Sequence, residues 1–309
     1  MKVSCRKAFT QELSAQAEMN PAIYAIATDS RGSVTLNDFA ERLPDQFLEL
    51  GIAEQNAVSV ACGLAATGCN VFVCGPACFL SARSYEQIKV DVAYNNTNVK
   101  IVGVSAGVSY GPLGGTHITL NDFAGMRSLP NIQVMAPCDD VQARALTQYL
   151  AQYEGPAYMR MGRGVVEAVY KDGETFEPGK AKLLREGKDI TIIACGEMVC
   201  VAEQAASLLR DRGIGGRVLD MFTLKPYDED ALIRAAKETG YIITVEEHGV
   251  NGGLGELVCR VVAENHPCPV RVIAFPDEEY MVGSGKDLFK HYGFTADNIA
   301  AHAADMLGV

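Results

Sequence analysis

A carboxylate in the first turn of a helix is the first residue of this chain that is placed for chemistry. Glu54 opens the segment 54–66, EQNAVSVACGLAA, which is apolar on most faces. An acid at this position is also explained by the helix dipole alone, which stabilises negative charge there. We nevertheless expect the apolar helix to be buried, and Glu54 to be at least partly buried with it. A buried carboxylate needs a partner or becomes neutral, and a neutral carboxylic acid beside a basic ring nitrogen is a proton donor.

A histidine in a glycine-rich loop is the second candidate. The loop SAGVSYGPLGGTHITLNDFAGMR, residues 105–127, follows a predicted strand that ends near Ser105. Its five glycines allow the backbone to approach a ligand closely. His117 is the only histidine of the first half of the chain. Because ligands of open α/β sheets bind at the carboxyl ends of strands, we favour a functional His117 over a structural one.

Several arginines lie near the same predicted edge. Arg160 and Arg163, in YMRMGRG, follow a predicted strand at 157–159. A guanidinium suits a phosphate or carboxylate, and the alternative for each is a surface ion pair. Arg6, in SCRKAF, and the polar turn 28–35, TDSRGSVT, also begin or end elements there.

A second glycine-rich segment, EEHGVNGGLGELV at 246–258, precedes a predicted helix in the second half. Such a segment can cradle a phosphate at a helix N-terminus. It lacks the G-x-G-x-x-G pattern, so we favour a tight strand-to-helix turn. His248 is therefore favoured as a packing residue over a ligand.

Strand-like and helix-like segments alternate along the chain and must position these residues. This alternation predicts βαβ units, that is, an α/β fold with mainly parallel sheets flanked by helices. Residues 164–188 break the rhythm, because they are polar and contain several glycines and Pro178. We predict a first domain at 1–164, a linker at 165–188 and a second domain at 189–309. The expected strands are 22–27, 70–75, 99–105, 132–137, 189–195, 216–220, 240–246 and 269–275, and the expected helices are 53–66, 81–94, 139–152, 197–211, 228–239, 253–264 and 295–306.

Composition excludes several classes of partner. The 309 residues are 48% hydrophobic and 21% charged, and the net charge is −11 with scattered acids, which disfavours nucleic acid and anionic membranes. The segment 1–16 lacks the apolar stretch of a signal peptide, and no run of about 18 apolar residues occurs. We therefore expect a cytoplasmic protein that contacts no membrane. The ten cysteines fit reduced thiols, and their spacings match neither a zinc nor a redox motif, so no metal is predicted for them.

Taken together, the motifs resemble the carboxyl-terminal half of transketolases. The matching segments, in order, are LELGIAEQN, GGTHITLNDFAGMRSLPNIQV, APCDD, GPAYMRMGR, VLDMFTLKPYDED, VEEHGVNGGLGE and GSGKDLFKHYGFT. The resemblance implies a pyrimidine-binding domain, a transketolase carboxyl-terminal domain and transfer of a two-carbon ketol unit between sugar phosphates. In that family the other half binds the diphosphate of thiamine diphosphate and a divalent metal through a G-D-G motif, which does not occur here. We therefore expect one subunit of a split transketolase, with Mg²⁺ bound mainly by an amino-terminal partner subunit in an α2β2 assembly.

The resemblance also implies roles for individual residues. Glu54 matches the acid that meets N1′ of the cofactor's aminopyrimidine, and His117 matches a histidine beside the reacting centre. Phe79 is expected to stack on the pyrimidine, with Leu80 as the alternative at that place. The other cofactor-binding matches are Asp29 and Arg83. The matches to residues that hold the sugar phosphate are Arg6, Ser33 and Arg163.

Two departures from the family pattern put the ordinary pentose phosphate substrates in doubt. Ser105 stands where many transketolases have a histidine, and Leu113 stands where they have an aspartate that contacts substrate hydroxyls. A site that lacks these polar groups discriminates differently among substrates. The alternatives are an enzyme like deoxyxylulose phosphate synthase, an enzyme like the β-subunit of 2-oxoacid dehydrogenases, and a non-catalytic half that serves as a binding module.

Overall fold

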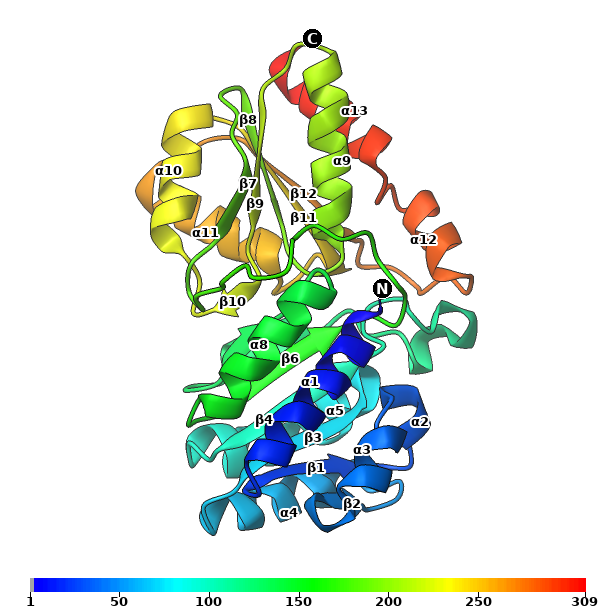
Figure 1. Cartoon of the computed structure of the whole chain (residues 1–309). Coiled ribbons are helices and arrows are strands. Elements are labelled where there is room, and N and C mark those ends of the chain that lie inside the picture. Colours follow the sequence, from blue (N-terminus) through cyan, green and yellow to red (C-terminus); the bar gives the residue numbers. More distant parts are fainter. Residues whose placement is uncertain (1–2) are drawn as a thin grey trace.

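The computed structural model describes residues 3–309 and contains two sheets, one above the other in Figure 1. The first sheet has the strands β1 (Ile23–Ala27), β2 (Phe47–Glu49), β3 (Asn70–Pro76), β4 (Val99–Val104), β5 (Gln133–Met135), β6 (Ala157–Met161) and β10 (Thr223–Lys225). Their order is β10-β5-β6-β4-β3-β1-β2, and all neighbours are parallel except β10 and β5.

Alternate side chains of the first sheet pack against two layers of helices. In β3, Val71 and Val73 share a core cluster with α4 (Glu54–Ala66), whereas Phe72 and Cys74 pack with α1 (Cys5–Met19) and α8 (Asp140–Gln152). Successive side chains of a strand point to opposite faces, so an apolar run such as that of β3 has both faces covered. The layer of α4 also contains α5 (Ala77–Arg83), α6 (Tyr85–Gln87), the π-helix η2 (Ile88–Tyr94) and α7 (Asp122–Ser128).

Short helical segments connect the strands near one end of this sheet. Between β1 and β2 the chain forms α2 (Arg31–Val34), α3 (Asn37–Arg42) and η1 (Pro44–Gln46), and the loop after β4 contains the 3₁₀ segment η3 (Gly111–Thr116). The segments α2 and η3 lie where the chain leaves β1 and β4, so they are available to line a site, whereas η1 leads into β2.

The second sheet has five strands in the order β12-β11-β8-β9-β7, and only β7 is antiparallel to its neighbour. Its strands are β7 (Lys182–Arg185), β8 (Ile190–Ala194), β9 (Gly216–Asp220), β11 (Ile242–Gly249) and β12 (Val270–Phe275). One face packs against α9 (Met198–Asp211) and α13 (Ala296–Leu307), and the other against α10 (Glu229–Thr239) and α11 (Leu254–Asn265). The remaining helix, α12 (Gly285–His291), lies beside the loop that contains η3 (Figure 1).

The predicted α/β fold with two mainly parallel sheets is confirmed. Two strands fall outside the predicted division of the chain. The predicted linker contains β7, which pairs with β9, and the predicted second domain contributes β10 to the first sheet. The domain boundaries themselves stay a prediction.

One predicted helix takes a different form. The sequence predicts a single helix over 81–94, but the chain forms α5, α6 and η2 in succession. The Ser81 and Ser84 hydroxyls donate to the carbonyl oxygens of Ala77 and Leu80, four residues earlier. Such back-bonding by serine bends helices, which accounts for the break.

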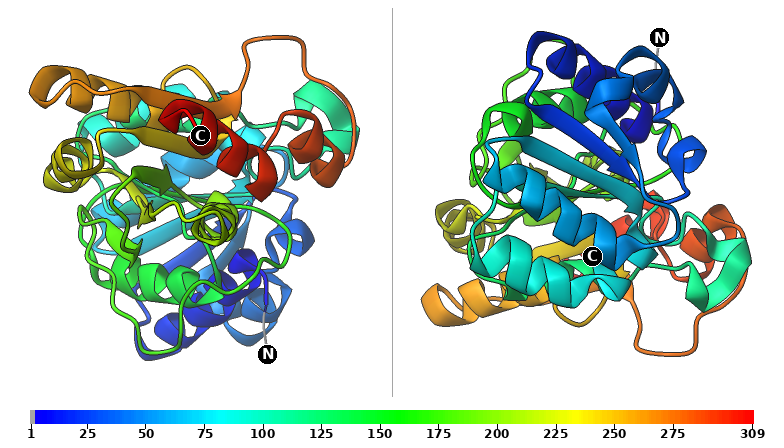
Figure 2. Two further views of the ribbon diagram at one scale, coloured as in Figure 1. Left: turned by 90° about the horizontal axis from the view of Figure 1, so that it is seen from above. Right: turned by 90° about the horizontal axis from the view of Figure 1, so that it is seen from below.

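Helix α4 is buried on one face only, so the expectation of a buried helix was wrong for its other faces. Ala57, Val58 and Ala61 are fully buried, whereas Ser59 and Gly63 are exposed. Figure 2 shows α4 and η2 side by side at the surface of the first domain. Among residues 3–309, no helix is both long and apolar enough to cross a membrane.

Candidate active site

A cavity of about 360 Å³ opens at the carboxyl ends of neighbouring strands of the first sheet. Residues 28–33 follow β1, residues 76–83 run from the end of β3 through α5, and residues 110–117 follow β4, so that side chains distant in sequence line one hollow. This edge is where open parallel sheets bind ligands. The lining residues are Thr28, Asp29, Ser30, Ser33, Ile52, Glu54, Pro76, Phe79, Arg83, Tyr110, Leu113 and His117.

Glu54 is the acid of this cavity. Its side chain is only 2% exposed, and Oε2 accepts a hydrogen bond from Arg83 Nη1 at 2.7 Å. The first turn of α4 places the carboxylate at the positive end of the helix dipole, and the Arg83 cation offsets the loss of hydration. Both the expected burial and the expected need for a partner are therefore met, and the partner is the Arg83 guanidinium.

Phe79 contacts both Arg83 and His117. The Arg83 guanidinium lies 4.7 Å from the centroid of the Phe79 ring, and the Phe79 and His117 ring centroids are 5.2 Å apart, edge to face. Phe79 lines the cavity, while Leu80 is fully buried in the core beside β3. Of the two residues considered for stacking, Phe79 is therefore the one that a ligand can touch.

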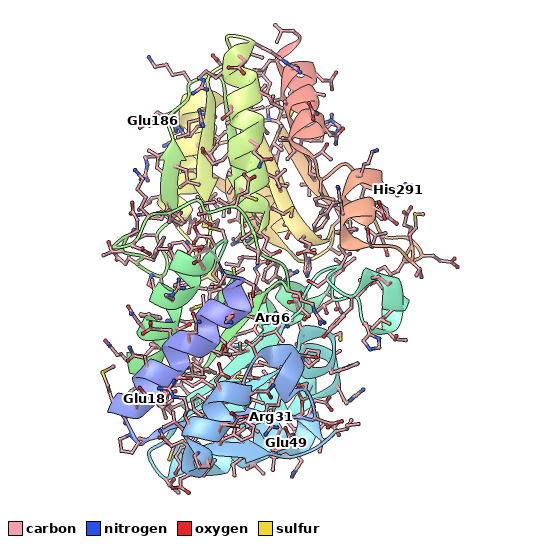
Figure 3. The ribbon with its side chains drawn as sticks, turned by 45° about the vertical axis from the view of Figure 1, so that its right-hand side comes forward. Arg6, Glu18, Arg31, Glu49, Glu186 and His291 are labelled. Carbon is pink, nitrogen blue, oxygen red and sulfur yellow. The ribbon has the colours of Figure 1, made fainter. Side chains whose placement is uncertain are left out.

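Ser33 lines the cavity, and Arg6 and Arg163 lie just outside its lining, where Arg6 contacts Ser33 and Arg163 contacts Tyr110. Arg6 lies at the end of α1 that faces the second domain (Figure 3) and donates through Nη1 to the Ser33 carbonyl oxygen. Burial, followed by the neighbouring positive charge of Arg163, lowers the pKa of Arg6. The Arg163 guanidinium lies 5.0 Å from the centroid of the Tyr110 ring. Within residues 3–309 neither arginine forms a salt bridge, so both cations can bind an anion.

The turn after β1 brings polar groups to the cavity wall. Asp29 has a left-handed backbone, with φ of 54°, and its N–H donates to Glu49 Oε1 at 2.7 Å. The Thr28 and Ser30 hydroxyls are buried and have no hydrogen-bond partner among the described residues. Buried hydroxyls are normally paired, so these two are available to a polar ligand.

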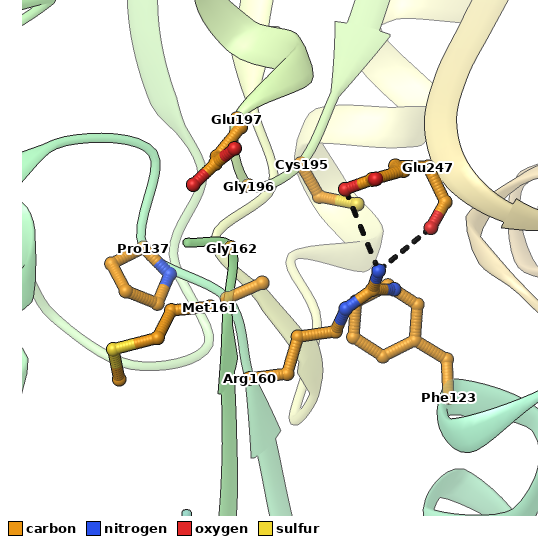
Figure 4. Close-up of a pocket in the computed structure, with 10 residues that line it drawn as sticks. Phe123, Pro137, Arg160, Met161, Gly162, Cys195, Gly196, Glu197 and Glu247 are labelled. Atoms are coloured by element: carbon orange, nitrogen blue, oxygen red, sulfur yellow. Dashed lines mark hydrogen bonds and ion pairs between the residues drawn. The ribbon is translucent and has the colours of Figure 1, made fainter. Parts of the chain in front are cut away.

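Arg160 was a candidate for anion binding, but it lies away from this cavity, at the junction of the two domains (Figure 4). It is 4% exposed, and its Nη2 donates to the Glu247 carbonyl oxygen at 2.8 Å. Its guanidinium also lies 3.5 Å from Asp122 Oδ2 and 3.7 Å from Glu247 Oε2. Arg160 is thus committed to ion pairs, as in the alternative that the sequence left open, although these pairs are buried rather than at the surface.

The glycine-rich segment 246–258 forms the tight turn that was favoured for it. Glu246 accepts hydrogen bonds from the Leu254 and Gly255 N–H groups at 2.6 and 2.7 Å, so a carboxylate already fills the N-terminus of α11. His248 is fully buried and stacks on Phe123 with ring centroids 5.2 Å apart. Burial lowers the pKa of His248 to about 4, as expected for a neutral packing histidine.

The sequence did not single out Tyr110, which the structure places beside the candidate residues. Its ring centroid lies 5.8 Å from that of His117, edge to face, and on its other side it contacts Arg163. Leu113, 55% exposed, lines the same wall. The only available signal for Tyr110 was its position inside the glycine-rich loop. In residues 3–309 no group of three or more His, Cys, Asp or Glu side chains could hold a metal ion.

Two protein-family models match the chain. The pyrimidine binding domain of transketolase matches residues 1–168, and the C-terminal domain of transketolase matches residues 179–299. Together they cover most of both domains that the structure contains.

Similar proteins include subunits of transketolases. The chain is 51% identical over 306 residues to one component of the apulose-4-phosphate transketolase of Phocaeicola vulgatus, covering 99% of this chain and 98% of that one. It is 37% identical over 299 residues to a component of the 6-deoxy-6-sulfo-D-fructose transketolase of a Clostridium species, covering 96% and 93%. Among solved structures, a split gene transketolase described as an inactive β4 tetramer superimposes with a TM-score of 0.90 at 38% identity, covering 100% of this chain and 99% of that one.

Proposed function

The chain belongs to the transketolase family, and from this premise we propose that it supplies the pyrimidine-binding half of the active site in a split, thiamine-diphosphate-dependent transketolase. The reaction transfers a two-carbon ketol unit between sugar phosphates. The single observation that carries the proposal is the cavity in which the buried Glu54 carboxylate, the Phe79 ring and His117 line one space.

The side chains of this cavity suit an aminopyrimidine ring. Phe79 offers an aromatic face, Glu54 offers a carboxylate to a ring nitrogen, and the unpaired Thr28 and Ser30 hydroxyls offer further hydrogen bonds. In this assignment Glu54 holds a proton at N1′, while Asp29 and Arg83 line the cavity around the pyrimidine ring. When bound, thiamine diphosphate supplies the electron sink that stabilises the transferred two-carbon unit.

His117 and the two arginines act on the sugar in this proposal. His117, at the cavity wall beside Phe79, exchanges a proton with a substrate oxygen. Arg6, which contacts Ser33, and Arg163, which contacts Tyr110, bind the phosphate beside the cavity. Anchoring the phosphate there fixes the reacting carbon near His117, which contributes by orientation.

We assign the diphosphate and Mg²⁺ to an amino-terminal partner subunit, as in an α2β2 assembly. The partly uncovered apolar face of α4, which includes Val60 and Leu64, supports contact with another polypeptide. The similar structure described as an inactive β4 tetramer also supports a requirement for a second kind of subunit, because that structure holds one type of subunit. This chain alone is therefore expected to be inactive.

The substrate is proposed to be a ketose phosphate with fewer hydroxyl contacts than pentose phosphates make. Leu113 presents an apolar side chain to the cavity, and Ser105, fully buried, has a hydroxyl without a partner among the described residues. Apulose 4-phosphate, which is named for the 51% identical relative, is the first donor to test. Pyruvate is the matched control donor, because its use would favour an enzyme like deoxyxylulose phosphate synthase.

The test replaces Glu54 by Gln in the complex reconstituted from this chain and its partner subunit. We expect turnover to fall by about 100-fold or more, because Gln cannot exchange a proton at N1′. Glu86→Gln, an exposed position on α6, is the control and should leave turnover unchanged. Wild-type turnover by Glu54→Gln would contradict the role of Glu54, whereas a wild-type complex inactive with every ketose phosphate would contradict the proposed function.

A further inference from the structure

The second domain forms hydrogen bonds with both ends of the loop that carries His117. The loop is closed at its neck, where Gly107 and Thr119 exchange two backbone hydrogen bonds of 3.1 and 2.9 Å. Just inside the neck, the Val108 N–H donates to Glu247 Oε1 at 2.8 Å. Just outside it, the Leu120 carbonyl oxygen accepts from the Gly249 N–H at 2.8 Å. Glu247 and Gly249 both lie in β11, so one strand of the second domain holds the two arms of the loop.

Glu247 is closely fitted to this neck. A Cβ atom added to Gly107, whose φ is +62°, would lie 2.0 Å from the Glu247 carboxyl carbon, so only glycine allows the carboxylate to approach. On its other side Glu247 faces Arg160, which binds its carbonyl oxygen and lies 3.7 Å from Oε2. The carboxylate thus connects the loop to the buried ion-pair network of the domain junction (Figure 4).

The tip of the loop is covered by a second segment of the same domain. The Gly283 N–H donates to the Gly111 carbonyl oxygen at 3.4 Å. A Cβ atom added to Gly115 would lie 2.9 Å from Tyr280, and one added to Gly114 would lie 3.2 Å from Val282. Tyr280 therefore packs directly on the backbone two residues before His117.

We propose that Glu247 is a positioning residue, which holds the 107–119 loop through the Val108 N–H and thereby fixes His117 and Tyr110 over the cavity, with Tyr280 as the support at the loop tip. The catalytic part of this inference rests on the proposed function, whereas the structural part does not. The second domain, which contributes no side chain to the cavity lining, then acts on the reaction by keeping this loop in one conformation.

Hydrogen–deuterium exchange of the full chain tests the structural part without substrate. In Glu247→Ala, which removes the acceptor, amides of 107–119 should exchange about tenfold faster than in wild type. Glu247→Gln keeps an acceptor oxygen and should restore most of the protection. Asp189→Ala is the matched control, because Asp189 Oδ2 also accepts from a backbone N–H, that of Gly215 at 2.6 Å, at a site of the second domain away from the loop. Unchanged exchange in Glu247→Ala, or equal acceleration by Asp189→Ala, would overturn the proposal.

Tyr280→Ala provides a variant that does not depend on a buried charge, because Tyr280 is 47% exposed. It should accelerate exchange at 111–117 and leave the amides of β11 protected.

In the reconstituted complex, Glu247→Ala should lower kcat about tenfold while leaving the dissociation constant of thiamine diphosphate unchanged, and Glu247→Gln should recover most of kcat. Faster exchange without any loss of kcat would overturn the positioning role, whereas a complex inactive in wild type as well would count against the proposed function alone.

Discussion

Arg83 is shared between the two side chains that we assign to the pyrimidine. It pairs with the Glu54 carboxylate and lies over the Phe79 ring. Because Arg83 is 46% exposed, its pairing is partly screened by water and is weaker than the burial of Glu54 alone would indicate. A side chain of this kind can leave one of its contacts when a ring enters, while the buried carboxylate stays in place.

His117→Ala is expected to separate chemistry from cofactor binding. The imidazole lies at the cavity wall against Phe79 and Tyr110, so its removal should lower kcat by about 100-fold, as loss of a general acid–base group does. Thiamine diphosphate affinity of the complex, measured by calorimetric titration, should change little. His266→Ala, an exposed position at the end of α11, serves as the control. Unchanged kcat in His117→Ala would return this residue to a structural role.

The sequence predicted that several candidate residues would lie together, but it could not place the two arginines that follow residue 159, because it misjudged the length of one strand. Glu54, Phe79 and His117 were expected together and line one cavity. Arg160 and Arg163 could not be separated, because the strand was expected to end at residue 159. It continues to Met161, so Arg160 lies inside β6 and points into the domain junction, while Arg163 lies beyond the strand and reaches Tyr110.

At the level of elements, the long strands and helices were predictable and the short crossing strands were not. Apolar runs such as β3 and β4 are stabilised within their own domain and carry a clear local signal. Strand β10 has three residues, and it pairs with β5 of the first sheet although the chain on either side of it belongs to the second domain. Pairing of this kind depends on the final approach of two domains, which no local pattern encodes.

Glu197, in the segment that joins β8 to α9, is a buried acid with a raised pKa, and it predicts that stability depends on pH. Burial, and then the negative charge of Glu247, raise the pKa of Glu197 from 4.5 to about 8. Its Oε1 is buried without a partner among the described residues. Between about pH 5 and about pH 8 the unfolded chain releases this proton while the folded chain keeps it, so the Glu197 contribution to stability is lost as the pH rises.

Glu197→Gln cannot titrate and removes this contribution. The free energy of unfolding of the variant, relative to wild type, should therefore increase from about pH 5 to about pH 8. Urea denaturation of both proteins at the two pH values measures the difference. Glu203→Gln is the control for removing a half-buried carboxylate as such, because Glu203, on α9, pairs with Arg185 at 3.0 Å. Parallel pH profiles of Glu197→Gln and wild type would contradict the assignment.

Across the whole molecule, the two domains are connected by a shared hydrophobic cluster and by buried ion pairs as well as by the chain. One hydrophobic cluster runs from α4 and β3 through β10 to α10 and α11, and Arg160 links Asp122 of the first domain with Glu247 of the second. A junction this apolar, with a buried ion-pair network, favours a fixed arrangement of the domains over free hinge motion. The cavity and the loop above it are therefore held as one unit, which in the proposed function is completed by the diphosphate-binding half of a partner subunit.

A substitution on helix α4 tests whether the proposed partner subunit binds to the exposed face of this helix. Gly63 lies on its exposed face, and a Cβ atom added there would meet nothing within 4 Å. Gly63→Gln should therefore stabilise the isolated chain by about 0.5 kcal/mol, because Gln is the better helix former. If this face is covered in the complex, the same side chain should weaken binding of the partner subunit at least about tenfold, since it must be accommodated in a packed interface.

Sedimentation of mixtures of the two subunits measures the binding, and thermal unfolding of the chain alone measures the stability. Ala301→Gln, at an exposed position of α13 in the second domain, is the matched control and should alter neither the assembly nor the fold. A stable Gly63→Gln chain that still binds its partner with wild-type affinity would show that α4 faces solvent in the complex. Helix α2, which carries the cavity-lining Ser33, would then be the next surface to test for contact with the partner.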